Sequence, residues 1–242
     1  MKKAENIINS IEEYAPLELA EKWDSVGLMI GDKNADVSKV MLCLDVTQEV
    51  VNEAIELGCQ MIVSHHPFIF HALKNIDVSR AKGKIITALL KNNISVYSAH
   101  TNLDYADNGV NDCLFKCVAK ALNKEGMSAE KFAKVIKEET GCATVKIMQG
   151  KEITIKSAMS ACGAFDGNIQ AVFESGADVL VVGEIKYNDS VELIENGITI
   201  FEIGHYDSEK IVLPVLKNYL NEIHTDVDFY LTSVGFKATI IY

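Results

Sequence analysis

The segment Met61-Ile62-Val63-Ser64-His65-His66-Pro67 decides how this chain folds. Its first four residues form a run typical of a strand, and Pro67 disfavours both continuing the strand and starting a regular helix at His66. Both imidazoles therefore lie where the chain leaves a sheet, and open α/β folds bind ligands at the carboxyl ends of their strands. Neighbouring strand residues point to opposite faces, but a turning chain can bring both into one cluster. A lone histidine is more often structural, whereas for this pair a metal site and a structural role are both open alternatives.

The first half of the chain alternates strands with helices around this segment. Its strand-like runs are Val40–Val46, Met61–Ser64 and Ile94–Ala99, with helical stretches at Glu49–Leu57 and Ala81–Lys91. Alternation of this kind predicts a mainly parallel sheet with right-handed crossovers.

The second half repeats the plan. Its strand-like runs are Ile153–Met159, Val179–Val182 and Ile198–Ile203, with helices at Asn168–Glu174 and Ser190–Glu195. The stretches Glu56–Val63 and Glu174–Val181 also match, each with a glycine shortly before an aliphatic run. Duplication explains the match, whereas the alternative is that any two α/β units share such patterns. The sequence predicts an α/β fold with two similar lobes, residues 1–125 and 126–242. Each lobe is predicted to be a β-α-β-α-β unit, with a metal site in the cleft between the two lobes.

Two further stretches are expected to form hairpins. A helix is predicted at Ala129–Glu139 and a strand at Ala143–Met148, which Gly150 turns into the strand after it. The end of the chain predicts a second hairpin, with arms at Phe229–Val234 and Phe236–Tyr242.

Composition narrows the class of protein. The 242 residues are 48% hydrophobic and 24% charged, as in ordinary soluble domains, and no apolar run approaches the roughly 20 residues that span a bilayer. The N-terminus lacks the apolar core of a signal peptide, and the six cysteines show no disulfide or Cys-x-x-Cys spacing. We therefore expect a cytoplasmic protein with reduced thiols. The net charge of −11 weighs against duplex nucleic acid as a partner.

Three segments offer metal ligands directly after predicted strands. They are Ser64-His65-His66-Pro67, His100-Thr101-Asn102-Leu103-Asp104 and Gly204-His205-Tyr206-Asp207-Ser208-Glu209. The candidate ligands are His65, His66, Asp104, His205 and Glu209. Two divalent ions, about 3.5–4 Å apart, would use this set better than one. Mixed nitrogen and oxygen donors favour zinc, iron or manganese. The alternative is a histidine pair with two unrelated polar loops.

These same segments resemble the Nif-three-like (YbgI-like) family of dinuclear-metal proteins, whose members are often labelled GTP cyclohydrolase I type 2 homologues. Ala20–Leu28 and Gly183–Tyr187 match as well, so the resemblance runs from about Leu17 to Glu209. It implies two metal ions on the five ligands given above, two similar α/β lobes and a toroidal homohexamer. Many relatives have histidine where this chain has Asn188.

Two hypotheses of function follow. The first is a metal-dependent hydrolase that activates a bridging water, with GTP as the substrate that the family label suggests; the sequence itself has no base-reading motif. The second is a non-catalytic metal-binding scaffold or regulatory interaction protein. A transcription regulator in direct contact with DNA is a weaker third, opposed by the charge. No membrane partner is expected, and the substrate would be a small molecule, with a nucleotide as one candidate.

Other residues complete the prediction. His100 and Glu184 are candidate catalytic groups, His100 as a general base or as a residue that orients a ligand. Structural roles are the alternative for both. The small-residue segment Ser160–Gly167 is expected to be a turn that could present backbone N–H groups to an anion, although it lacks a Walker spacing. Trp23 is expected to anchor the N-terminal segment in the core.

Overall fold

The computed structural model describes residues 1–122 and 125–235, which form two compact units. Unit 1 comprises Met1–Asp107 and Leu213–Tyr242, and unit 2 comprises Asn108–Val212. This division differs from the expected boundary at residue 125. The chain returns to unit 1 because β11 (Asp228–Leu231) pairs in parallel with β4 (Lys39–Cys43). Residues 108–121 join unit 2 because their apolar side chains pack in its core.

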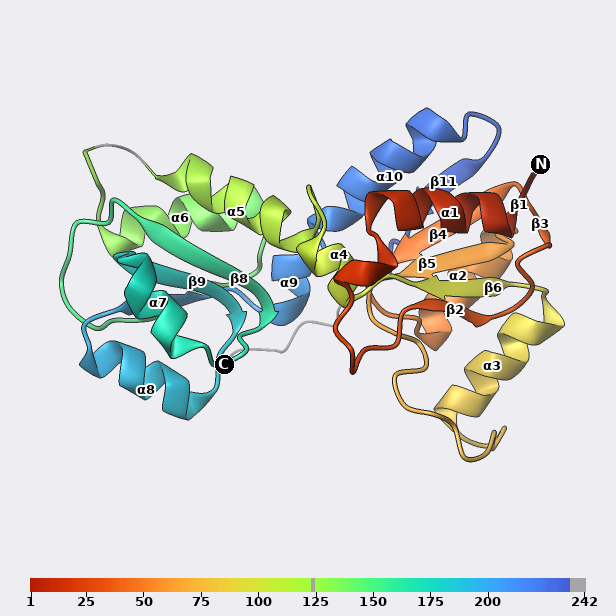
Figure 1. Cartoon of the computed structure of the whole chain (residues 1–242), viewed down its shortest axis with the longest axis horizontal. Coiled ribbons are helices and arrows are strands. Elements are labelled where there is room, and N and C mark those ends of the chain that lie inside the picture. Colours follow the sequence, from red (N-terminus) through yellow and green to blue (C-terminus); the bar gives the residue numbers. More distant parts are fainter. Residues whose placement is uncertain (123–124, 236–242) are drawn as a thin grey trace. The chain divides into compact units, whose positions relative to one another are not determined.

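Unit 1 is built on a five-stranded sheet of order β11-β4-β5-β6-β2 (Figure 1). Strands β11, β4, β5 and β6 are parallel, and β2 pairs antiparallel with β6. The remaining strands are β5 (Met61–Ser64), β6 (Ser95–Ser98) and β2 (Gly27–Ile30), together with a two-stranded pair, β1 (Lys2–Lys3) and β3 (Asp36–Val37). The helices are α1 (Ala4–Tyr14), the 3-10 turn η1 (Leu17–Leu19), α2 (Gln48–Leu57), α3 (Ala81–Lys91), α4 (Thr101–Tyr105) and α10 (Val212–Ile223).

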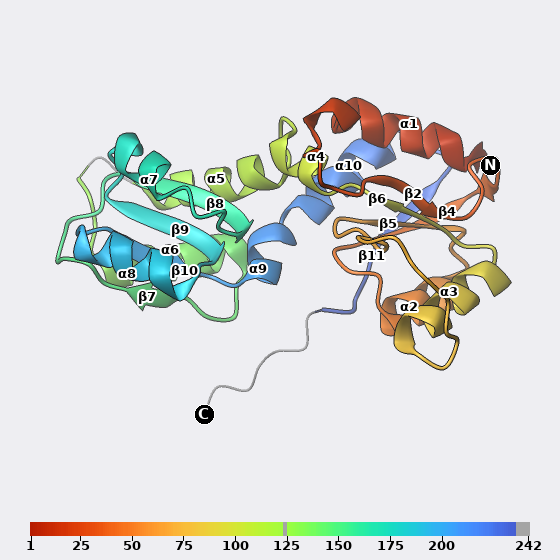
Figure 2. The same cartoon turned by 60° about the horizontal axis from the view of Figure 1, so that its bottom comes forward.

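Helices cover both faces of this sheet. Helices α2 and α3 lie on one face, and α1 and α10 lie on the other (Figures 1 and 2). On the first face, Val50 of α2 and Leu89 of α3 belong to one core cluster with Ile62 of β5. A strand covered on both faces is expected to be largely apolar, which is why β5 begins with three consecutive apolar residues.

Unit 2 has a four-stranded sheet of order β7-β10-β9-β8. Its strands are β7 (Lys146–Met148), β8 (Ala158–Ala164), β9 (Val179–Glu184) and β10 (Thr199–Glu202), and its helices are α5 (Val110–Ala121), α6 (Ala129–Thr140), α7 (Ile169–Ser175), α8 (Tyr187–Glu195) and α9 (His205–Glu209). Alternate residues of β9 enter two different cores. Val179 and Val181 pack with α5 and α6, whereas Leu180 and Val182 pack with α7 and α8. Across the described parts of both units, no helix has the length and apolar character to cross a membrane.

The two units share one topology. In each, three consecutive parallel strands are joined by helices, and an antiparallel strand, β2 or β7, pairs with the third of them. The α/β class and the repeated unit are therefore as predicted.

Two local predictions were wrong. The strand predicted at Ile153–Met159 lies later, at Ala158–Ala164. The hairpin around Gly150 does not form, because β7 pairs with β10 rather than with the strand that follows it. In the predicted C-terminal hairpin, the first arm is β11, paired with β4, and the second arm lies outside the described residues.

Candidate metal centre

The turn after β5 fixes the two adjacent histidines. The sheet ladder continues past the strand end, where His65 N–H donates to Cys43 O and His66 N–H to Leu44 O. The buried hydroxyl of Ser64 donates to His66 O over 3.0 Å. Ser98, at the end of β6, lies 2.8 Å from the Ser64 hydroxyl and accepts from Phe68 N–H. The chain therefore turns at a defined place, and His65 is buried there.

Both adjacent histidines have an oxygen acceptor at Nδ1. His65 Nδ1 lies 2.9 Å from the carbonyl oxygen of Ala99. His66 Nδ1 lies 2.8 Å from an Asp45 carboxylate oxygen. A carbonyl oxygen and an ionised carboxylate can only accept, so Nδ1 must carry the proton in both rings. The lone pair of each neutral ring is then on Nε2, which is the arrangement typical of metal-binding histidines.

Asp24 is the acceptor that faces Nδ1 of His100. That Nδ1 lies 2.9 Å from Asp24 Oδ1, and the Asp24 side chain has no exposed surface. Asp24 also accepts from Ser25 N–H and from both the N–H and the hydroxyl of Thr101. Burial raises the pKa of Asp24, but the hydrogen bonds from Thr101 and His100 outweigh burial and leave the pKa below its ordinary value. Asp24 is therefore an ionised acceptor, and His100 carries its proton on Nδ1.

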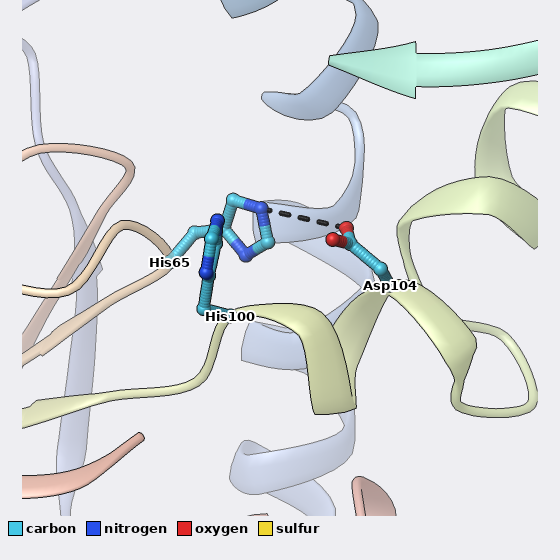
Figure 3. Close-up of side chains that lie close together, drawn as sticks. All are labelled: His65, His100 and Asp104. Atoms are coloured by element: carbon cyan, nitrogen blue, oxygen red, sulfur yellow. Dashed lines mark ion pairs between the residues drawn. The ribbon is translucent and has the colours of Figure 1, made fainter. Parts of the chain in front are cut away.

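His65, His100 and Asp104 form a group able to hold a metal ion, with ligand atoms within 4.8 Å of one another. Asp104 lies on α4, four residues after His100, and its N–H donates to His100 O. Figure 3 shows the Asp104 carboxylate facing the His65 ring, where Nε2 and Oδ1 are 3.5 Å apart. The imidazole lone pair and the carboxylate are both electron-pair donors. They attract each other only through a cation between them or a proton on Nε2, so the geometry fits a metal ion.

Unit 2 places His205 between two carboxylates. His205 begins α9, and its Nε2 lies 3.1 Å from Oε1 of Glu209 at the end of that helix. Its Nδ1 lies 3.6 Å from Oε2 of Glu184, at the end of β9. Glu209 is buried, whereas the Glu184 side chain is 58% exposed. The His205–Glu209 pair thus forms as predicted from the four-residue spacing, with Glu184 beside it.

Two glycines make room for this pair. A Cβ on Gly163 would come within 2.4 Å of Glu209 Oε1, and one on Gly183 within 2.3 Å of Gly163 O. The Ser208 hydroxyl accepts from Gly163 N–H and donates to His205 O, which ties α9 to β8. The segment Ser160–Gly167 was expected to be a turn that could present N–H groups to an anion, but most of it belongs to β8. Its small residues allow the strand to approach α9 closely.

The sequence missed two carboxylates and misplaced one aromatic residue. Asp24 belongs to a matched motif but was given no role, and Asp45 follows β4 at the same sheet edge as His66, a position that could have identified it. Trp23 is not a core anchor, because it is 61% exposed. Asn188 is exposed on α8.

The fold and the site define a class of protein. It has two α/β units and a group of histidine and aspartate side chains just after strand ends. The profile of the Duf34/NIF3 (NGG1p interacting factor 3) family matches residues 2–237, so the chain belongs to that family. A "GTP cyclohydrolase 1 type 2 homolog" of Clostridium perfringens is 31% identical, covering 95% of this chain and 96% of its own. A Staphylococcus aureus hypothetical protein has a TM-score of 0.89 at 26% identity, covering 99% of both chains. A Bacillus cereus protein related to NIF3 has a TM-score of 0.91 at 23% identity, covering 100% of this chain and 99% of its own.

Proposed function

We propose that this protein binds two divalent metal ions and is a metal-dependent hydrolase. The observation that carries the proposal is the oxygen that lies within 2.9 Å of Nδ1 in each of His65, His66 and His100, which leaves Nε2 of a neutral ring to bind a metal ion. Histidines that bind a metal ion almost always donate their other ring N–H to a carboxylate or carbonyl oxygen or to water. The five proposed ligands are His65, His66, Asp104, His205 and Glu209.

The donor set selects among metals. It combines imidazole nitrogens with carboxylate oxygens, and cysteine is absent from the proposed ligands, which suits zinc, iron or manganese. When bound, such ions supply Lewis acidity and lower the pKa of a coordinated water towards neutrality.

The residues of the chain itself have separate roles in this proposal. Asp24 and Asp45 hold their histidine rings in one orientation and one tautomer. His100 either joins the ligands or accepts a proton from the substrate or water through Nε2, and Glu184 orients His205. The substrate is a small molecule, for which the label carried by relatives suggests a ring C–N bond in GTP.

A second candidate is a non-catalytic scaffold. The family name refers to an interacting factor rather than to a reaction, which favours a protein partner. In this case the metal ions would stabilise the fold, and a homohexamer would present the binding surface. An ion that keeps a coordination position for water would favour the hydrolase, and a saturated ion would favour the scaffold.

Elemental analysis of the untagged protein, purified without chelator, tests the proposal. We expect about two ions per chain, with fewer in His65→Ala and Glu209→Ala. The matched control is His71→Ala, which removes an exposed histidine outside the metal group. No bound metal after reconstitution with zinc, iron or manganese would contradict the proposal. Metal-loaded protein would then be screened for hydrolysis, with GTP among the substrates.

A further inference from the structure

Two exposed aromatic side chains lie against the metal group of unit 1. Trp23 is 61% exposed and Phe70 is 39% exposed, and their ring centroids are 6.0 Å apart. Both rings meet His100 edge to face, with centroid distances of 6.3 Å for Trp23 and 6.4 Å for Phe70. The three rings therefore form a triangle, and one corner is a candidate metal ligand.

Polar anchors hold this pair of exposed rings in place. Trp23 precedes Asp24, whose buried carboxylate binds His100 and Thr101. The hydroxyl of Ser25 donates to the carbonyl oxygen of Phe70 over 3.1 Å and joins the two loops. Large aromatic rings gain free energy when they leave water, so a fold that fixes two of them at the surface favours an occupant there.

The size of the patch suits a small molecule. An aromatic side chain buries about 150–250 Å² when fully covered, so the two rings offer well under the roughly 800 Å² that each partner contributes to a stable protein interface. The same His100 ring touches the aromatic pair and belongs to the group with His65 and Asp104. A ligand that binds a metal ion at that group would therefore lie near a ring that contacts both Trp23 and Phe70.

We propose that Trp23 and Phe70 form a subsite for a flat aromatic or heteroaromatic ring whose attached oxygen or nitrogen donor binds the metal. This inference rests on the proposed metal function and names the substrate class of that site. Edge-to-face and offset stacking favour an unsaturated ring over a saturated ring of the same size.

Three hydroxamates test the subsite, because they carry the same metal-binding group. The probes are acetohydroxamate, benzohydroxamate and cyclohexanecarbohydroxamate, titrated calorimetrically into the zinc-loaded full chain. We expect benzohydroxamate to bind more tightly than both other probes. Trp23→Leu and Phe70→Leu should each weaken benzohydroxamate by about five-fold to 150-fold, from the usual strength of ring stacking. Acetohydroxamate binding and zinc content should stay unchanged in both variants. Phe115→Leu, which removes an exposed aromatic ring of unit 2, is the control and should leave all three affinities unchanged.

The same titrations distinguish failure of the metal proposal from failure of the subsite proposal. Acetohydroxamate that does not bind the zinc-loaded wild type refutes an accessible metal, and with it both proposals. Acetohydroxamate that binds, with no advantage for the phenyl ring or with the advantage retained in both variants, overturns the subsite alone. A change in oligomer mass in Trp23→Leu or Phe70→Leu would show that a second copy of the chain covers the rings, which also overturns the subsite. Trp23 is the only tryptophan in the sequence, so wild-type fluorescence should change when benzohydroxamate binds and not when acetohydroxamate binds.

Discussion

Replacing Asp24 by asparagine should lower both the stability of the fold and the affinity of the protein for metal. The two carboxylate oxygens accept from Ser25 N–H, His100 Nδ1–H, Thr101 N–H and the Thr101 hydroxyl. An amide nitrogen must replace one of these oxygens, and it then faces donors in a site without solvent. A buried donor without an acceptor costs about 1–3 kcal/mol, so Asp24→Asn should unfold more readily by about that amount.

Metal affinity should fall as well in Asp24→Asn. His100 belongs to the group able to hold a metal ion, and if it is a ligand, loss of the carboxylate that holds its ring should weaken metal binding about 10-fold to 100-fold. A competition titration of zinc against a chromophoric chelator measures this effect, and urea unfolding measures the effect on stability.

Asp178 provides a matched control for Asp24. It accepts from Lys156 N–H, Ser157 N–H and the Ser157 hydroxyl. It lies just before the first residue of β9, whereas Glu184, which is beside His205, is the last residue of that strand. Asp178→Asn should therefore destabilise the protein and leave zinc affinity unchanged. Wild-type zinc affinity in Asp24→Asn would refute the reasoning, and so would an equal loss of affinity in both variants.

Three further substitutions have defined expected outcomes. Gly163→Ala should destabilise the protein by about 1–2 kcal/mol, because φ is +57°. It should also lower metal content by displacing the Glu209 carboxylate, as elemental analysis would show. Asp45→Asn should weaken zinc binding less than Asp24→Asn does, because the Asp45 side chain is 51% exposed and solvent can replace its bond to His66; the same chelator titration checks this. Burial lowers the pKa of His224 below 6.5, so the folded state takes up its proton later than the unfolded chain, and the free energy of unfolding should fall as pH drops below about 6.5. Urea unfolding at about pH 7.5 and about pH 5.5 should show a smaller fall for His224→Gln, and an unchanged fall would contradict this assignment.

The local parts of the fold could be predicted from the sequence. Strand β5 and helix α3 have the predicted bounds, because an aliphatic run closed by His-His-Pro and an amphipathic stretch are local patterns. The pairing of β7 with β10 could not be predicted, because it joins residues about 50 positions apart, and a glycine turn suggested a nearer partner.

The residues of the candidate site also fall into those that local sequence patterns predicted and those that they did not. His65, His66 and the His205–Glu209 pair could be proposed because each lies within one short segment at a strand end. The pairing of Asp24 with His100 spans 76 residues, so no spacing rule reveals it. The exposure of Trp23 was missed because tryptophan is usually well buried, and the hydrogen bond that joins its loop to Phe70 links residues far apart in the sequence.

The internal repeat extends to the candidate ligands themselves. In unit 1 the third parallel strand, β6, is followed by His100 and, four residues later on a five-residue helix, Asp104. In unit 2 the third parallel strand, β10, is followed by His205 and, four residues later on a five-residue helix, Glu209. A carboxylate lies beside Nδ1 of each histidine. Because one topology generates both pairs, a role for His205 as a metal ligand argues for the same role at His100.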